Sequence, residues 1–173
     1  LDFGESRERF NETQPAGTVL ASVPAVGSEL SPGDTVDLVI SKGRRPIEVG
    51  SWVGKDVERA VQRLERRDLV ASVTQVFDDT APVGEVVAQS PTSGTLNKGD
   101  TVALTVSKGP ELVEVPDVIR FGIDAAVRAL EDAGFTTRTE RNSFFAGLGF
   151  AVRTDPEPGS MAPRGSLVTI VVV

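Results

Sequence analysis

The feature that most constrains the fold is an internal repeat. The pattern Gly-x6-Pro-x2-Gly begins at Gly17, Gly84 and Gly149, at spacings of 67 and 65 residues. Each copy leads into a Val-rich segment; these segments are residues 33–43, 99–109 and 165–173. Self-similarity at such a period indicates a tandem array of small structural units, each with its own hydrophobic core, rather than one large core.

A helix is predicted in two of the three units. The apolar positions recur at i, i+3, i+4 and i+7, which places them on one helical face. These positions are Val57, Ala60, Val61 and Leu64, followed 66 residues later by Ile123, Ala126, Val127 and Leu130. Asp56 suits the N-cap of the first helix, and Gly134 suits the residue after the second. Within the second unit we predict a short strand at 48–49, a helix over 56–67 and strands near 70–77, 85–89 and 101–107.

The repeat sets the expected domain boundaries. We predict a partial unit over 1–45, a complete unit over 46–109 and a complete, divergent unit over 110–173. Residues 10–15 align with 77–82, so counting back from them leaves no room in the first unit for its first strand and helix. The expected fold class is α+β, with tandem small repeats that each pack one helix on a three-stranded sheet. Short Pro-containing connectors favour an elongated rod.

Composition excludes most enzyme classes. The chain has no His and no Cys, which excludes a Ser-His-Asp triad, a Cys nucleophile, a conventional zinc site and a disulfide framework. We therefore predict no catalytic residues, no metal site and no cofactor. The net charge of -7 argues against a nucleic-acid partner. No apolar run reaches the 18 residues or so that a membrane-spanning helix needs.

Several motifs carry a resemblance to a known family. Residues 115–118 read Val-Pro-Asp-Val, and the second helix ends in Ala-Gly-Phe at 133–135. Residues 40–43 and 106–109 end in Ser-Lys-Gly. With the Pro-x2-Gly turns and Val-rich last strands, the whole chain resembles PASTA repeats, one partial and two full. It departs from the family at Gly50, where Pro is expected, and most strongly in the last unit.

The resemblance implies a function and a location. PASTA repeats form the extracytoplasmic part of membrane serine/threonine kinases of Gram-positive bacteria, or a C-terminal appendage of class B penicillin-binding proteins. The implied ligand is a peptidoglycan fragment (muropeptide) or its lipid-linked precursor. The implied location is the outer side of the membrane, with the anchor outside this chain. Three units favour the kinase setting; the appendage and a ligand-free structural spacer remain alternatives. We expect a monomer, with ligand-induced dimerisation as the alternative.

The last unit is the expected ligand head. All six of its bases are Arg, whose planar fork grips carboxylates and phosphates. Two adjacent Phe residues lie in its divergent loop and could stack on a sugar face. The candidate ligand residues are Arg138, Arg141, Phe144, Phe145 and Arg153. The alternative is that the Arg side chains are solvated and one Phe turns into the core as the counterpart of Phe77.

Overall fold

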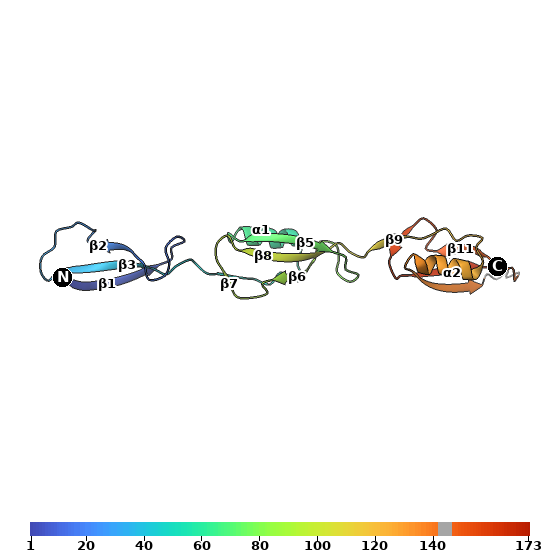
Figure 1. Cartoon of the computed structure of the whole chain (residues 1–173), viewed down its shortest axis with the longest axis horizontal. Coiled ribbons are helices and arrows are strands. Elements are labelled where there is room, and N and C mark those ends of the chain that lie inside the picture. Colours follow the sequence, from blue (N-terminus) through green and yellow to red (C-terminus); the bar gives the residue numbers. More distant parts are fainter. Residues whose placement is uncertain (142–146) are drawn as a thin grey trace. The chain divides into compact units, whose positions relative to one another are not determined.

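The computed structural model describes residues 1–141 and 147–173. Contacts divide the chain into two compact units: Leu1–Gln75 with Gly84–Val106, and Val76–Val83 with Ser107–Val173. Figure 1 labels both helices and most of the strands, and each repeat is described in turn below.

The first repeat is a bare sheet. Its elements are β1 (Asp2–Arg9), β2 (Val19–Val23) and β3 (Thr35–Ser41). They form a sheet of order β1-β3-β2, with β1 parallel and β2 antiparallel to β3. Residues 1–43, all of which the structure describes, contain no helix. Leu1 and Phe3 remain 72% and 67% exposed, because nothing within the repeat covers the face on which a helix would pack.

The second repeat has a helix and a closed core. Its elements are β4 (Ile47–Glu48), α1 (Val57–Glu65), β5 (Val70–Val76), β6 (Val86–Ser90), β7 (Thr95–Leu96) and β8 (Thr101–Ser107). The sheet order is β5-β8-β6, and β4 pairs with β7. Ala60 and Leu64 of α1 share one buried cluster with Val102, Leu104 and Val106 of β8. This packing follows from the four-residue spacing on the helix and the two-residue spacing on the strand.

The third repeat follows the same plan. Its elements are β9 (Leu112–Glu114), α2 (Ile123–Asp132), β10 (Thr136–Arg141), β11 (Ala151–Asp155), β12 (Met161–Pro163) and β13 (Leu167–Val172). The sheet order is β10-β13-β11, and β9 pairs with β12. Ala126 and Leu130 of α2 share a buried cluster with Val168, Ile170 and Val172 of β13.

The predicted fold class is confirmed, with one helix on a three-stranded sheet in each complete repeat. The side chain of Asp56 caps α1 as predicted, since it accepts the Arg59 N–H at 3.0 Å. The sequence analysis missed β7 and β12. Two- and three-residue strands show no periodicity, and these two exist only because each pairs with the first strand of its repeat.

The Ser-Lys-Gly endings have a structural role. The Ser107 hydroxyl donates to the Ala81 carbonyl at 2.8 Å and accepts the Gly109 N–H at 2.9 Å. Lys108 Nζ lies 3.9 Å from the centroid of the Phe77 ring. The glycine has a φ of 76°, a left-handed conformation that Gly adopts without strain. The ending therefore ties the last strand to the preceding loop.

Candidate functional site

Equivalent backbone hydrogen bonds relate the second and third repeats. Gly54 N–H donates to the Val86 carbonyl, and Arg120 N–H donates to the Ala151 carbonyl, both at 2.8 Å. Arg120 therefore stands where the second repeat has a glycine. Gly54 has a φ of 76° and Arg120 a φ of 69°. An L-residue with a side chain is strained in this left-handed region, and such strain is often retained at functional sites.

The surface beside this position changes character between the repeats. Lys55 of the second repeat corresponds to Phe121 of the third. The Lys55 carbonyl accepts the Val86 N–H, and the Phe121 carbonyl accepts the Ala151 N–H, both at 2.9 Å. Glu85 corresponds to Phe150 in the same way. Each forms an isolated antiparallel bridge with the residue that precedes the helix of its own repeat. Phe121 and Phe150 remain 45% and 47% exposed. Two charged residues of the second repeat are thus replaced by two exposed aromatic rings in the third.

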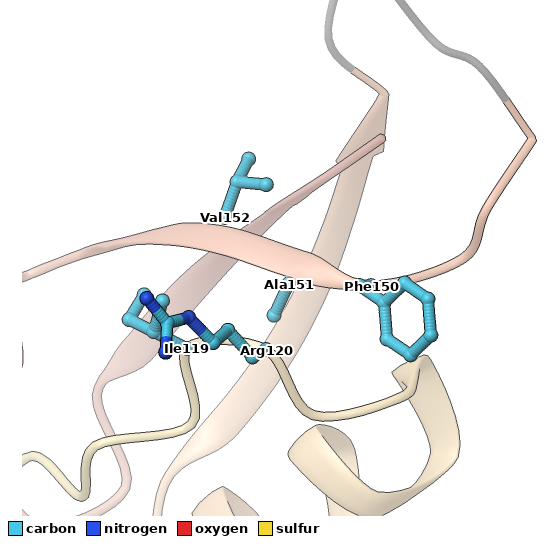
Figure 2. A pocket seen from close by; sticks show the side chains of 5 residues that line it. All are labelled: Ile119, Arg120, Phe150, Ala151 and Val152. Atoms are coloured by element: carbon cyan, nitrogen blue, oxygen red, sulfur yellow. The ribbon is translucent and has the colours of Figure 1, made fainter.

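A cavity of about 350 Å³ lies at this surface. It is lined by Ile119, Arg120, Phe150, Ala151 and Val152. Figure 2 shows the side chains of Ala151, in β11, and of Phe150, just before it, on the side where the Arg120 side chain runs past Ile119. The lining is apolar except for one guanidinium. Such a cavity can take a ligand that has an apolar or sugar face and an anionic group.

The loop that presents Arg120 is held by one hydrogen bond within the loop and one to β11. The Asp117 carboxylate accepts the Ile119 N–H at 3.0 Å, and the Arg120 N–H is bonded to β11. Within the described residues, Arg120 forms no ion pair within the 4.0 Å limit. Arg164, by contrast, donates to Glu111 at 2.7 and 3.3 Å. That hydrogen bond and the charge of the carboxylate raise the pKa of Arg164. Arg120 is therefore available to an anion from solution in a way that Arg164 is not.

The structure separates the three arginines that the sequence analysis singled out. Arg138 and Arg141 lie on β10, and Arg153 lies on β11, with β13 between these strands. Arg138 forms an exposed ion pair with Glu140 at 3.4 Å. Arg153 directly follows Val152 of the cavity lining. Of the three, Arg153 is the one next to the cavity in sequence, and a ligand role for each of them stays a prediction.

Phe144 and Phe145 lie outside the described residues, so their predicted role stays a prediction. The sequence analysis did not single out Arg120, Phe121 or Phe150. A residue-by-residue alignment of the repeats contains the missing signal, because it sets an arginine against Gly54. Only the structure shows that Arg120 adopts the same left-handed backbone conformation as Gly54, in which a residue with a side chain is strained.

The described residues give no indication of metal binding or of a membrane span. Among residues 1–141 and 147–173, no three His, Cys, Asp or Glu groups gather in a way that could hold a metal ion. Within the same residues no helix is long and apolar enough to cross a membrane.

Two complete copies of a helix on a three-stranded sheet, preceded by a third sheet of the same topology, define a chain of tandem small α+β repeats. The model of the PASTA domain matches residues 1–42, 47–108 and 113–173. The chain belongs to the PASTA domain family.

Its relatives include proteins that carry kinase names. The chain is 32% identical over 152 residues to "Probable serine/threonine-protein kinase pknA2" of Bifidobacterium longum, covering 87% of this chain and 20% of that protein. It is 31% identical over 165 residues to "Probable serine/threonine-protein kinase SCO3848" of Streptomyces coelicolor, covering 93% and 24%. The chain thus spans about a fifth to a quarter of the length of these curated relatives.

Solved structures show the same relationship. The extracellular region of the Ser/Thr kinase PrkC from Staphylococcus aureus matches with a TM-score of 0.74 and 27% identity, over 98% of this chain and 61% of that one. A three-PASTA-domain structure of a Ser/Thr kinase from the same organism matches with a TM-score of 0.68 and 25% identity, over 98% and 86%. The chain is thus a non-catalytic PASTA region like those of serine/threonine kinases.

Proposed function

We propose that this chain is the extracytoplasmic wall-sensing region of a membrane serine/threonine kinase. We further propose that its third repeat binds peptidoglycan fragments or the lipid-linked precursor. One observation carries the choice of repeat. Where the second repeat has Gly54, Lys55 and Glu85, the third has Arg120, Phe121 and Phe150, of which Arg120 and Phe150 line an apolar cavity.

The chemistry of that cavity suits a muropeptide. An exposed aromatic ring can pack on the apolar face of a sugar. Phe150 lines the cavity, and Phe121 directly follows Arg120 of the lining in the sequence. An Arg fork can take a carboxylate of the peptide part through two parallel hydrogen bonds. The site is open and small, so we expect weak affinity, about micromolar or weaker.

The alternatives differ in what they require of this surface. A ligand-free spacer needs neither exposed aromatic rings nor a strained arginine, and the second repeat, with charged residues at the same positions, suits that role. A C-terminal appendage of a penicillin-binding protein would use the same repeats in another protein. The kinase names of the relatives favour the kinase setting. We expect the chain to be a monomer without ligand, and sedimentation with and without muropeptide tests for ligand-induced dimers.

The decisive experiment is an NMR titration of the 173-residue chain with purified muropeptides. We expect shifts in the amides of residues 119–122 and 150–153, and at least tenfold weaker binding in a Phe121→Lys/Phe150→Glu variant, which copies the second repeat. Lys55→Gln/Glu85→Gln is the matched control and should bind as the wild type does. Shifts confined to the second repeat would show that the third repeat is not the binding site, and unchanged affinity in the aromatic variant would show that the cavity is not the binding site.

An Arg138→Ala/Arg141→Ala/Phe145→Ala variant tests the residues chosen from sequence alone. If it loses binding while the Phe121/Phe150 variant keeps it, the ligand lies near β10 rather than in the cavity. If both variants bind normally, the third repeat belongs to a spacer.

A further inference from the structure

The first repeat has a cavity of its own, of about 250 Å³. It is lined by Glu12, Thr13, Gln14, Pro15 and Arg44. Side chains of opposite charge, Glu12 and Arg44, thus line the same cavity. Within the part of the chain that the structure describes, they form no ion pair with each other within 4.0 Å. A carboxylate and a guanidinium that share a cavity without meeting leave room for a ligand that carries both signs of charge.

The wall of this cavity is held in place by its own loop. The Asn11 side-chain oxygen accepts the backbone N–H groups of Thr13 at 2.9 Å and Gln14 at 2.8 Å, and the Thr13 hydroxyl at 2.9 Å. The Ser41 hydroxyl donates to the Gln14 carbonyl at 2.9 Å and ties the loop to β3. Because these bonds fix the loop without a ligand, little ordering is needed on binding.

Positive charge is concentrated at this end of the repeat. Residues 1–45 contain five basic residues; the four at this end are Arg9, Lys42, Arg44 and Arg45. Lys42 is partly neutralised by Glu8 at 3.3 Å. Arg45 lies over the Phe10 ring, 5.5 Å from its centroid, and its N–H donates to Glu12 at 3.4 Å. The chain segment at the cavity thus carries two adjacent arginines, Arg44 and Arg45, against the one carboxylate of the lining, Glu12, in a chain of net charge -7.

The second repeat shows that this charge is not needed for the fold. Its equivalent loop is closed in the same way, with the Asp78 carboxylate accepting the Thr80 and Ala81 N–H groups at 2.8 Å. After the shared Lys-Gly, the second repeat continues with Pro110 and Glu111, where the first has two arginines. The same loop geometry thus exists without Arg44 and Arg45, so neither arginine is required to form it.

We propose that the Glu12–Arg44 cavity binds a small zwitterion made of a phosphate group and a primary ammonium on a short linker. Arg44, with the field of Arg45, takes the phosphate, since an Arg fork matches phosphate oxygens. Glu12 takes the ammonium. A free phosphate monoester carries about -1.5 to -2 charges at pH 7, so this form of the ligand is net negative and complements the net positive site. A lipid headgroup is a phosphodiester whose single negative charge its ammonium balances, so it depends on the paired Arg44 and Glu12 contacts alone. This site is separate from the muropeptide site proposed for the third repeat and stands or falls without it.

The test is an NMR titration of the 173-residue chain with three probes: phosphoethanolamine, inorganic phosphate and ethanolamine. We expect phosphoethanolamine to shift the Thr13 and Gln14 amides with about millimolar affinity, severalfold tighter than either single-charge probe. Arg44→Gln should weaken phosphoethanolamine by about tenfold, the effect of losing one charged hydrogen-bonding partner. Glu12→Gln should abolish the preference for phosphoethanolamine over inorganic phosphate. Arg63→Gln, an exposed change on α1, is the control and should leave the affinity unchanged.

Vesicles that contain phosphatidylethanolamine distinguish the source of the group. Binding to these vesicles that Arg44→Gln abolishes assigns the site to a lipid headgroup, and binding to the soluble probe alone assigns it to a free or polymer-linked group. Three results overturn the proposal: equal binding of all three probes, no effect of either cavity substitution, or an equal loss in the Arg63→Gln control.

Discussion

Replacing Arg120 by glycine should make the third repeat more stable. Arg120 has a φ of 69°, and the left-handed region costs a residue with a side chain about 1–2 kcal/mol. Glycine removes this cost but gains freedom in the unfolded chain, which lowers stability by about 0.4–1 kcal/mol. The strain is the larger of the two effects, so Arg120→Gly should stabilise the repeat by roughly 0.5–1 kcal/mol. In a domain of this size, that corresponds to an increase in Tm of about 2–8 °C.

The second repeat supplies the reciprocal change. Gly54 has a φ of 76°, and a Cβ added there would meet nothing within 4 Å. Gly54→Arg therefore introduces the same backbone strain without a steric clash, and it should destabilise the second repeat by the same 0.5–1 kcal/mol. Two substitutions of opposite sign and equal size isolate the backbone conformation from other effects of charge or packing.

Each repeat can be followed separately. Trp52 is the one tryptophan of the chain and lies in the core of the second repeat, so its fluorescence reports the unfolding of that repeat. Hydrogen exchange of the β13 amides reports the third. The reasoning fails if Arg120→Gly lowers protection in β13, or if Gly54→Arg leaves the fluorescence transition where it was. Weaker muropeptide binding by a stabilised Arg120→Gly chain would indicate that the arginine is kept for binding at a cost in stability.

Three further outcomes are expected. Hydrogen bonds from the Ala81 and Thr80 N–H groups and the Thr80 hydroxyl lower the pKa of Asp78 from 3.8. The ionised Asp78 carboxylate should therefore stabilise the fold fully above pH 3.8, and this stabilisation should be lost as the pH falls through the lowered pKa of the folded state. Asp78→Asn should remove this acid dependence yet keep the fold, since the first repeat closes the same loop with asparagine. Asp78→Ala should destabilise the fold at neutral pH. Acid unfolding curves of the wild type and the two variants test both expectations. Ser107→Ala should cost the second repeat about 1–3 kcal/mol in urea unfolding, because the Ala81 carbonyl and the Gly109 N–H both lose their partner. Finally, amides of residues 1–43 should exchange faster than those of 112–173 in the dilute chain, and equal protection would contradict the absence of a covering helix.

Much of the fold could be predicted because its signals are periodic. The spacing of Ala60 and Leu64 identifies a helical face, and the Val-rich segment that follows identifies the central strand on which it packs. Asp56 identifies the start of the helix by a single local hydrogen bond. These features depend on residues close in sequence, so they can be recognised without knowledge of the rest of the structure.

The candidate site was harder to predict because it depends on backbone conformation and on comparison between repeats. The sequence analysis grouped the third repeat's arginines by residue type, and β13 lies between the strands that carry Arg138 and Arg153. Arg120 looks like any other arginine until its φ is known. Phe150 looks like a core residue by its large apolar side chain, yet it is 47% exposed. Side-chain direction at the edge of a strand is set by pairing that the linear pattern does not contain.

The two complete repeats also separate what the fold requires from what can vary. The hydrogen bonds around Gly54 and Arg120 are the same, so the backbone does not demand an arginine there. The core does not demand exposed aromatic rings either, since Lys55 and Glu85 occupy the matching positions in a repeat that has a buried core of its own. A strained residue reduces stability, and exposed aromatic rings reduce solubility, so neither is expected to persist without a function. Their coincidence around one cavity is therefore better explained by binding than by folding, and the same comparison applied to Arg44 and Arg45 identifies the cavity of the first repeat.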